Sequence, residues 1–525
     1  MSQRTAVLMA AILGSAIVFL DATIVNVALE TIGRELPVTF VGRLEGLTYV
    51  NSAYFAVLAA LLILAGAISD YYGRRRTFRI GLIGFGAASV ACGLAPTMEV
   101  LIVARILQGA FGAILVPGSL AIITAYFDGE ERGRAIGLWA AGTSATSIIG
   151  PLLGGILVQG LTWRLAFLIN VPLVLLALWA TTRVPESRDE SATGDFDWLG
   201  AAVIAVAVGG LSFGATRGQE KNWQDPVAWV ALIVGLAAAV AIPVLMLKRP
   251  RPLIPPSLFR SRNFSVANLS TFVIYGALYV SFAFEGLFWQ GTLGYSPLAA
   301  GAVGLPIALF LTFLSTPAGQ LSARIGPRIF MTAGPLIMAA GLLWLARIPH
   351  DSTAWAADLG QPSTLVPPAP TILDVVLPVI VFGLGISLLV APLTTALMSS
   401  IPVNNAGLGS AINNAVSRAG SPLVSAVLFI AITATFYPSL AGLVPGVDVD
   451  DPALREQVQP LTSVPDDVDP EIAAAAREAS ADAFQLAMIV SAGLLLAGAA
   501  INGFGIRNPS RREIEAASEA PAATG

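Results

Sequence analysis

The sequence is poor in the residues that most often build disulfides and metal sites. Cys92 is the only cysteine and His350 the only histidine among 525 residues. One thiol and one imidazole cannot form a disulfide, a thiol-ligand zinc site or a histidine proton relay within one chain. We therefore expect no metal and no cofactor, and any proton carrier has to be a carboxylate.

Other absences exclude whole classes of function. No Gly-rich phosphate loop followed by lysine and a hydroxyl residue occurs, and no loop is long enough for a nucleotide-binding domain, which argues against an ATP-driven pump. No constellation of metal ligands, nucleophile or cofactor-binding residues indicates an enzyme. The net charge of −4, without a basic block on a water-facing domain, argues against nucleic acid as a partner.

Charge is scarce, and long apolar runs take its place. Only 12% of the residues are charged and 55% are hydrophobic, with a mean hydropathy of +0.77, whereas soluble domains carry about 25% charged residues. Apolar stretches of about 17 to 25 residues recur along the chain, which is the length that a helix needs to cross a bilayer. A soluble α/β enzyme would need shorter apolar runs and more polar surface.

The apolar runs and their breakers predict an all-α polytopic membrane protein with about fourteen transmembrane helices. Residues 1–185 hold a first six-helix bundle, residues 186–262 an inserted helix pair with its linkers, and residues 263–525 a second six-helix bundle. The acidic, proline-rich segment 437–482 is expected to be an extracellular loop or a small cap, and the chain ends in a short cytoplasmic tail. The expected spans cover residues 6–28, 47–68, 78–95, 100–121, 135–158, 163–181, 198–215, 228–247, 266–289, 299–320, 329–345, 372–393, 408–436 and 483–506.

The distribution of basic residues predicts the orientation in the membrane. With the N-terminus inside, the cytoplasmic loops and termini hold about nineteen Lys and Arg residues and the opposite loops about seven. We therefore expect a multi-pass protein of a bacterial plasma membrane with both termini in the cytoplasm. Membrane lipids are its expected surroundings, and we expect a monomer.

An internal repeat relates the two bundles. Four positions after the second span have counterparts after the tenth at identical spacings, and alanine replaces the aspartate in the second copy. In transporters such repeats place the substrate site between two halves that alternate. The displacement is eight spans rather than six, so the seventh and eighth spans are an insertion. The matching positions are Gly66, Asp70, Gly73 and Arg75, with Gly319, Ala323, Gly326 and Arg328.

The segment 66–76 reads Gly-Ala-Ile-Ser-Asp-Tyr-Tyr-Gly-Arg-Arg-Arg. It resembles the signature loop of the major facilitator superfamily. The resemblance implies that the aspartate caps or pairs across a cytoplasmic gate, that glycine allows close helix approach, and that arginine anchors to the inner face. An ordinary positive-inside loop is the alternative. The implied gate residues are Gly66, Asp70, Gly73, Arg74 and Arg75.

A second motif lies in the fifth span. Gly150, Pro151, Gly154 and Gly155 resemble the antiporter motif of exporters in this superfamily. Gly150 and Gly154 share a helix face, where missing side chains allow close packing, and Pro151 permits a bend. Plain helix packing is the alternative, and the resemblance favours export over uptake.

The first span gives the most specific resemblance. Residues 20–29 read Leu-Asp-Ala-Thr-Ile-Val-Asn-Val-Ala-Leu, which is similar to the first-helix motif of the fourteen-helix drug:proton antiporter branch. That branch places proline next, where this chain has Glu30. Asn170 and Arg418, with their neighbours, also match the branch.

Ionisable residues inside spans are candidates for proton coupling, because an isolated charge at membrane depth is costly. Asp21 and Glu285 lie in predicted spans, Glu30 lies near the outer mouth, and Arg105 matches the arginine-bearing fourth helix of the superfamily, which would lie across the bundle from Asp21. The alternatives are a polar helix staple for Asp21, a solvated rim position for Glu285 and carbonyl binding for Arg105.

Aromatic and amide residues in the spans are candidates for a substrate cavity between the bundles, because aromatic rings attract apolar and cationic ligands. Packing or interfacial anchoring is the alternative for many of them. The candidates besides Asp21 are Phe19, Asn51, Tyr54, Trp139, Tyr275, Phe284 and Trp289.

These features predict an exporter that exchanges inward-moving protons for an amphipathic, often cationic small molecule by alternating access, with multidrug efflux as the expected role. Dedicated export of one endogenous metabolite, lipid or peptide is the alternative. A non-transporting receptor or scaffold is a third reading, although the loops provide no soluble signalling domain.

Overall fold

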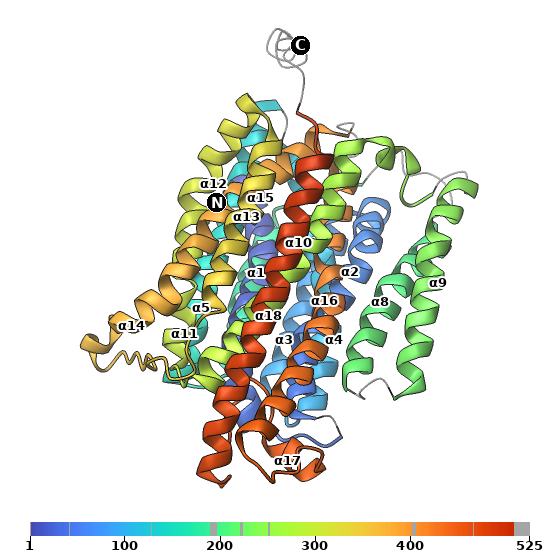
Figure 1. Cartoon of the computed structure of the whole chain (residues 1–525). Coiled ribbons are helices and arrows are strands. Elements are labelled where there is room, and N and C mark those ends of the chain that lie inside the picture. The colour runs from blue at the N-terminus through green and yellow to red at the C-terminus, as the bar shows by residue number, and fades with distance from the viewer. Residues whose placement is uncertain are drawn as a thin grey trace.

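Long helices running roughly side by side make up the molecule (Figure 1). The computed structural model describes residues 2–40, 42–127, 129–188, 197–220, 224–249, 252–401, 406–465 and 467–508. No β-strand occurs in these ranges beyond one isolated bridge between Asp358 and Gln361. The predicted all-α polytopic fold is confirmed.

Eleven helices within the described ranges are long and apolar enough to cross a membrane. The three other predicted spans correspond to α3, which begins with three arginines, to α5, and to the short pair α6 and α7. Capping residues start several helices: Ser2, Thr97 and Ser261 each accept a hydrogen bond from a backbone N–H in the first turn, which satisfies a donor that the helix itself cannot.

The first set of helices packs around α1. Contacts join α1 to α5 and α7, α2 to α4, and α3 to α4. The bounds are α1 (Gln3–Glu35), α2 (Arg43–Tyr72), α3 (Arg74–Gly93), α4 (Met98–Tyr126), α5 (Gly129–Gly160), α6 (Leu165–Leu168) and α7 (Asn170–Thr181).

The last set packs around α10, α13 and α15, with α16 and α18 against α10. Two short π-helical turns, η2 and η4, interrupt this set. The bounds are η1 (Pro256–Arg260), α10 (Arg262–Leu287), η2 (Phe288–Thr292), α11 (Pro297–Val303), α12 (Leu305–Ile325), α13 (Pro327–Leu345), η3 (Pro362–Leu365), α14 (Ala369–Thr371), η4 (Ile372–Val376), α15 (Leu377–Ser399), α16 (Ala406–Leu443), α17 (Pro452–Gln457) and α18 (Pro470–Gly505).

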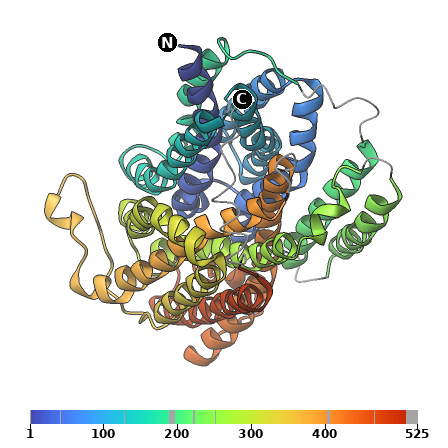
Figure 2. The same cartoon turned by 90° about the horizontal axis from the view of Figure 1, so that it is seen from above.

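Helices α8 (Trp198–Glu220) and α9 (Pro226–Lys248) form a hairpin at one side of the molecule (Figures 1 and 2). Glycines allow the two backbones to touch: a methyl group added at Gly214 would lie 2.7 Å from Leu232 N. Helix α8 packs on both α2 and α16. Only 6% of the apolar window of α9 is buried, so α9 presents its apolar surface outward, as a lipid-facing helix does.

The two ends of the bundle differ in character. The basic end, as we call it, carries Arg74–Arg76, Arg262 and Arg328 at helix starts, and the far end carries the segment 444–469, which includes α17 (Figure 1). This segment is shorter than the predicted loop 437–482, because α16 continues to Leu443 and α18 begins at Pro470. Polar residues extend both helices beyond their apolar parts, and the Asp469 carboxylate caps α18 by accepting from Glu471 N.

Candidate functional site

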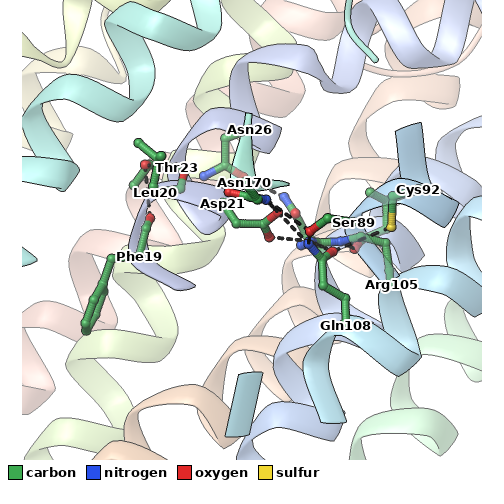
Figure 3. Close-up of polar contacts among 12 residues, drawn as sticks. Phe19, Leu20, Asp21, Thr23, Asn26, Ser89, Cys92, Arg105, Gln108 and Asn170 are labelled. Carbon is green, nitrogen blue, oxygen red and sulfur yellow. Dashed lines mark hydrogen bonds and ion pairs between the residues drawn. The ribbon is translucent and has the colours of Figure 1, made fainter. Parts of the chain in front are cut away.

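A buried polar network joins α1, α3, α4 and α7 (Figure 3). The Asp21 carboxylate accepts hydrogen bonds from Arg105 Nη1, from Gln108 Nε2 at 2.8 Å and from Asn170 Nδ2 at 3.0 Å. Gln108 Nε2 also donates to Ser89 Oγ at 2.8 Å. All five side chains are fully buried. Three polar partners around one carboxylate, with Ser89 behind two of them, make this the most connected buried site in the part of the chain that the structure describes.

Arg105 is held on three sides. Its Nε donates to Val50 O at 3.0 Å and its Nη1 also donates to Gln108 Oε1 at 2.7 Å. The guanidinium carbon lies 3.9 Å from the ring centroid of Tyr54, within cation–π range. Arg105 therefore binds a carbonyl and also pairs directly with Asp21.

Some polar atoms in and beside the network have no hydrogen-bond partner. Arg105 Nη2, Asn170 Oδ1 and Tyr54 Oη are buried without a hydrogen-bond partner among the described residues. Leaving a buried donor or acceptor unpaired is costly, so such atoms mark a place where water, a proton carrier or a ligand is favoured. The site therefore offers hydrogen-bonding groups to water or to a polar ligand beside Arg105.

Sequence reasoning singled out Asp21 and Arg105 but not Ser89, Gln108 or Asn170 as site residues. Gln108 lies three residues after Arg105, so the two share a helix face. Asn170 is the one amide in the apolar run 165–179. Polar residues within apolar spans were the available signal, whereas Ser89 has no such distinction, since serine is common in spans.

Glu30 lies near the far end of α1 and is also buried. Its Oε1 accepts hydrogen bonds from Ser463 Oγ at 2.7 Å and Ser463 N at 3.2 Å, and it pairs with Arg34 Nε at 3.3 Å. Burial lowers the pKa of nearby Arg43, and the negative charge of Glu30 opposes that shift. Glu30 therefore ties α1 to the far-end segment 444–469 and lies in basic surroundings.

Glu285 has different surroundings. It lies in α10 with 8% of its surface exposed, and no hydrogen bond or ion pair reaches its carboxylate from the described residues. A charged carboxylate without a partner is expensive at this depth. Its near-complete burial does not fit the solvated rim position that was the alternative.

The predicted gate loop connects two helices at the basic end. Gly73 adopts φ 107°, a conformation that favours glycine, and a side chain there would meet the Glu186 carboxylate. Glu186 accepts from Arg75 N at 2.9 Å and Arg76 N at 3.1 Å, capping α3, while Arg75 Nη1 donates to Val184 O at 3.0 Å. The loop thus ties α3 to the chain that follows α7.

Two other predicted gate residues lie close to neighbouring segments. Gly66 lies in α2 near Pro117 of α4, and Arg74 N donates to Ser187 O at 2.8 Å. The side chain of Asp70 lies outside the part of the chain whose side chains the structure describes. Its role at a gate stays a prediction.

The repeat recurs in three dimensions. Gly326 adopts φ 96°, Arg328 N donates to Asn508 Oδ1 at 3.1 Å, and Arg328 Nε donates to Gly503 O at 2.6 Å. Asn508 follows α18 as Glu186 follows α7. The two halves therefore share the same connection, with an amide where the first half has a carboxylate.

The glycine motif of α5 faces two directions. A methyl group at Gly154 would lie 3.2 Å from Ile24 O in α1, and Gly150 lies against Thr23 of the same helix. A methyl group at Gly155 would instead lie 2.7 Å from Leu298 Cα in α11, and Gly301 of α11 lies against the Pro151 carbonyl. The motif thus packs α5 both within its own bundle and against the other half.

The predicted cavity residues fall into separate groups. Tyr54, Phe55, Tyr275 and Tyr279 lie in one chain of ring contacts, with Phe55 stacked on Tyr279 at 5.3 Å. Phe19 lies beside this chain, because the guanidinium of Arg418 is 5.7 Å from the Phe19 ring and 5.6 Å from the Phe55 ring. We call Phe19, Tyr54, Phe55, Tyr275 and Tyr279 the aromatic cluster.

Four predicted cavity residues lie elsewhere. Asn51 donates to Asn26 Oδ1 at 2.5 Å, and Trp139 Nε1 donates to Ser15 Oγ at 3.0 Å. Trp289 packs edge-on against Phe484 at 5.7 Å, and Phe284 is buried in the core. A cavity of about 50 Å³ at the far end is lined by none of the seven candidates. Its lining residues are Gly291, Thr292, Thr462, Ser463, Val464, Ala476, Arg477 and Ser480.

Comparisons with known proteins agree with this architecture. The family profile described as Major Facilitator Superfamily matches residues 11–425. The multidrug resistance protein Stp of Mycobacterium tuberculosis is 33% identical over 440 residues, covering 82% of this chain and 77% of the relative. The puromycin resistance protein pur8 of Streptomyces alboniger is 31% identical over 443 residues, covering 83% of each. The methylenomycin A resistance protein of Streptomyces coelicolor is 30% identical over 422 residues, covering 79% and 83%.

Solved structures share the fold at low identity. A bacterial homologue of the human lysosomal transporter Spinster superposes with a TM-score of 0.62 at 17% identity, covering 97% of this chain and 99% of that one. A POT family transporter bound to a peptide conjugate superposes with a TM-score of 0.64 at 11% identity, covering 95% of each.

Proposed function

Because this chain belongs to the major facilitator superfamily, whose members are multi-pass membrane transporters, we propose that it exports amphipathic small molecules across a bacterial plasma membrane in exchange for protons. The names of the relatives support the direction, since they are resistance proteins against drugs and antibiotics. The glycine motif of α5, which resembles that of exporters, supports it as well.

The Asp21–Arg105 pair is the observation that carries the proposal. A carboxylate in contact with a guanidinium is stable in the interior only while both are charged, and protonation of Asp21 removes the attraction. Proton uptake therefore changes how strongly α1 and α4 hold together. The amides of Gln108 and Asn170 keep Asp21 in place in either state.

We further propose that the basic end faces the cytoplasm. Arginine-rich loops are retained on that side of a membrane, and the basic end carries Arg74–Arg76, Arg262 and Arg328. The substrate would then leave at the far end, where Glu30 and Ser463 join the two halves. In alternating access, the contacts between the halves at the far end would open while those at the basic end are closed, and the reverse.

The energy source gives the direct test. In cells loaded with a fluorescent substrate, a protonophore should abolish efflux, whereas depletion of ATP with the proton gradient held constant should leave efflux intact. Cells that carry the Asp21→Asn variant serve as the control for leakage. Efflux that follows ATP at constant gradient would rule out the antiport.

A further inference from the structure

Arg418 is a buried cation that the mechanism above does not use. It lies in α16, on the opposite half from Asp21 and Arg105, and is 2% exposed. A guanidinium has five N–H donors and stays charged at any physiological pH. Within the described residues, no acceptor forms a hydrogen bond with it and no carboxylate lies within ion-pair distance.

The other interior charges do not neutralise Arg418. Asp21 is already paired with Arg105. Glu285 lies in α10, about two and a half helical turns from Gly276, the residue that touches Gly420 of α16. The carboxylate of Glu285 is therefore remote from Arg418. Among the residues whose side chains the structure describes, nothing balances the positive charge of Arg418 at the interface of the halves.

The surroundings of Arg418 come from both halves. The Phe19 and Phe55 rings belong to α1 and α2, at 5.7 and 5.6 Å, and Tyr279, stacked on Phe55, belongs to α10. Two cation–π contacts near the 6 Å limit offset only part of the cost of a desolvated guanidinium. An anion placed beside the rings would supply the missing acceptors, and the rings would cover an apolar body.

We propose that Arg418 and the aromatic cluster bind the acidic group and the ring system of the transported molecule, so that the substrate is an amphipathic organic anion. This inference rests on the proposed export function and names its substrate class. It differs from the cationic ligand that aromatic residues alone suggested. Arg pairs with carboxylate, sulfate or phosphate in a fork geometry, which makes the acidic group the point of recognition.

Three pyrene probes test the charge preference: pyrenebutyrate, its methyl ester and a pyrenylbutyl-trimethylammonium ion. Equilibrium binding to the full chain in lipid nanodiscs is measured without any gradient. We expect pyrenebutyrate to bind more tightly than the ester by on the order of tenfold, the size of one charge-assisted contact. Equal or weaker binding of the carboxylate, or no binding of any probe, overturns the proposal.

Variants of Arg418 test whether this residue causes the preference for the carboxylate probe. Arg418→Gln should remove the preference for the carboxylate, Arg418→Lys should keep part of it, and Arg347→Gln, at an exposed arginine, should leave it unchanged. A preference that persists in Arg418→Gln overturns the assignment. Should Arg418→Gln fail to fold, the Arg418→Lys variant decides: a full preference with lysine, which cannot form the fork, would contradict it.

Transport of the same probes separates the two proposals. If pyrenebutyrate binds through Arg418 but a pH gradient moves no probe in proteoliposomes, proton-coupled export fails and the anion site stands. If a pH gradient moves the ester or the ammonium probe and the carboxylate has no advantage, export stands and the anion site fails.

Discussion

Asp21 and Arg105 carry opposite charges that neither residue could hold alone in the interior of the bundle. Each is fully buried, and the pair shares its hydrogen bonds with Gln108 and Asn170. Mutations of this pair therefore have two separable effects. Loss of the charge balance affects stability, and loss of a titrating group affects proton coupling.

Asp21→Asn should show both effects. Asparagine keeps the size and can still accept from Gln108 and Asn170, but Arg105 loses its counter-charge, at a cost of roughly 3–5 kcal/mol. We expect a lower Tm and no uphill transport on a pH gradient, measured in proteoliposomes.

The double variant Asp21→Asn with Arg105→Gln is the control for this prediction. Removing both charges should recover much of the Tm while uphill transport stays lost. If Asp21→Asn alone still concentrates substrate with a normal pH dependence, proton coupling must be assigned to Glu285 or Glu30.

Glu285→Gln should behave differently from Asp21→Asn. No cation pairs with Glu285 among the described residues, so the neutral isostere removes a costly charge and leaves no partner behind. We expect an unchanged or higher Tm and retained uphill transport, from thermal unfolding and uptake assays run in parallel. If this variant lost uphill transport while Asp21→Asn kept it, proton coupling would have to be assigned to Glu285 instead of Asp21.

At the scale of helices, the backbones of α5 and α11 approach each other closely across the two halves. Gly155 faces Leu298 at a distance that leaves no space for a side chain. Gly155→Leu should push the far-end contact apart and bias the protein toward the state that is open there. We expect faster labelling of a cysteine placed at the far end of α11 and reduced transport.

Gly160→Leu provides a matched control on the same helix. Gly160 is exposed, and nothing lies within 4 Å of an added methyl group. This variant should label and transport like the wild type. Equal labelling of the two variants would show that the α5–α11 contact does not set the conformational equilibrium.

The positions of the helices could be predicted from the sequence, whereas some of their ends could not. The apolar runs predicted the spans because the apolar length of a transmembrane helix is fixed by the bilayer. The ends of α16 and α18 were harder, because residues 437–443 and 470–482 are polar enough to resemble a loop, and whether such residues stay helical depends on caps and on packing at the far end.

The site was predictable to a similar extent. Residue type and depth identified Asp21 as a candidate, and the resemblance to the superfamily's fourth helix identified Arg105 and its place across the bundle from Asp21. The contact of Glu30 with Ser463 spans 433 positions in the sequence, and only the packed fold brings them together. The lack of an anionic partner for Arg418 among the described residues could not be predicted either, because it depends on the three-dimensional surroundings.

At the scale of the whole molecule, each half closes on itself at the basic end. Arg75 binds the chain after α7, and Arg328 binds the end of α18, so the third helix of each half is tied to its own last helix. Such closed halves favour movement as two rigid bodies rather than bending within either one. Their relative movement then concentrates at the surfaces between them.

Helix α8 lies on those surfaces, since it packs on α2 of one half and α16 of the other. If the halves rock, as alternating access requires, at least one of these contacts has to slide, and the small side chain of the buried residue Ala201 in α8 offers little to obstruct it. The hairpin of α8 and α9 would thereby limit the rate of the transport cycle, on the microsecond to millisecond timescale of domain movements.

Ala201→Leu should lower the maximal turnover rate and leave the equilibrium affinity for substrate unchanged, whereas Ala202→Leu, at the exposed neighbouring residue, should change neither. An equal turnover for both variants would mean that the hairpin travels with one half, and that the friction limiting the cycle arises elsewhere.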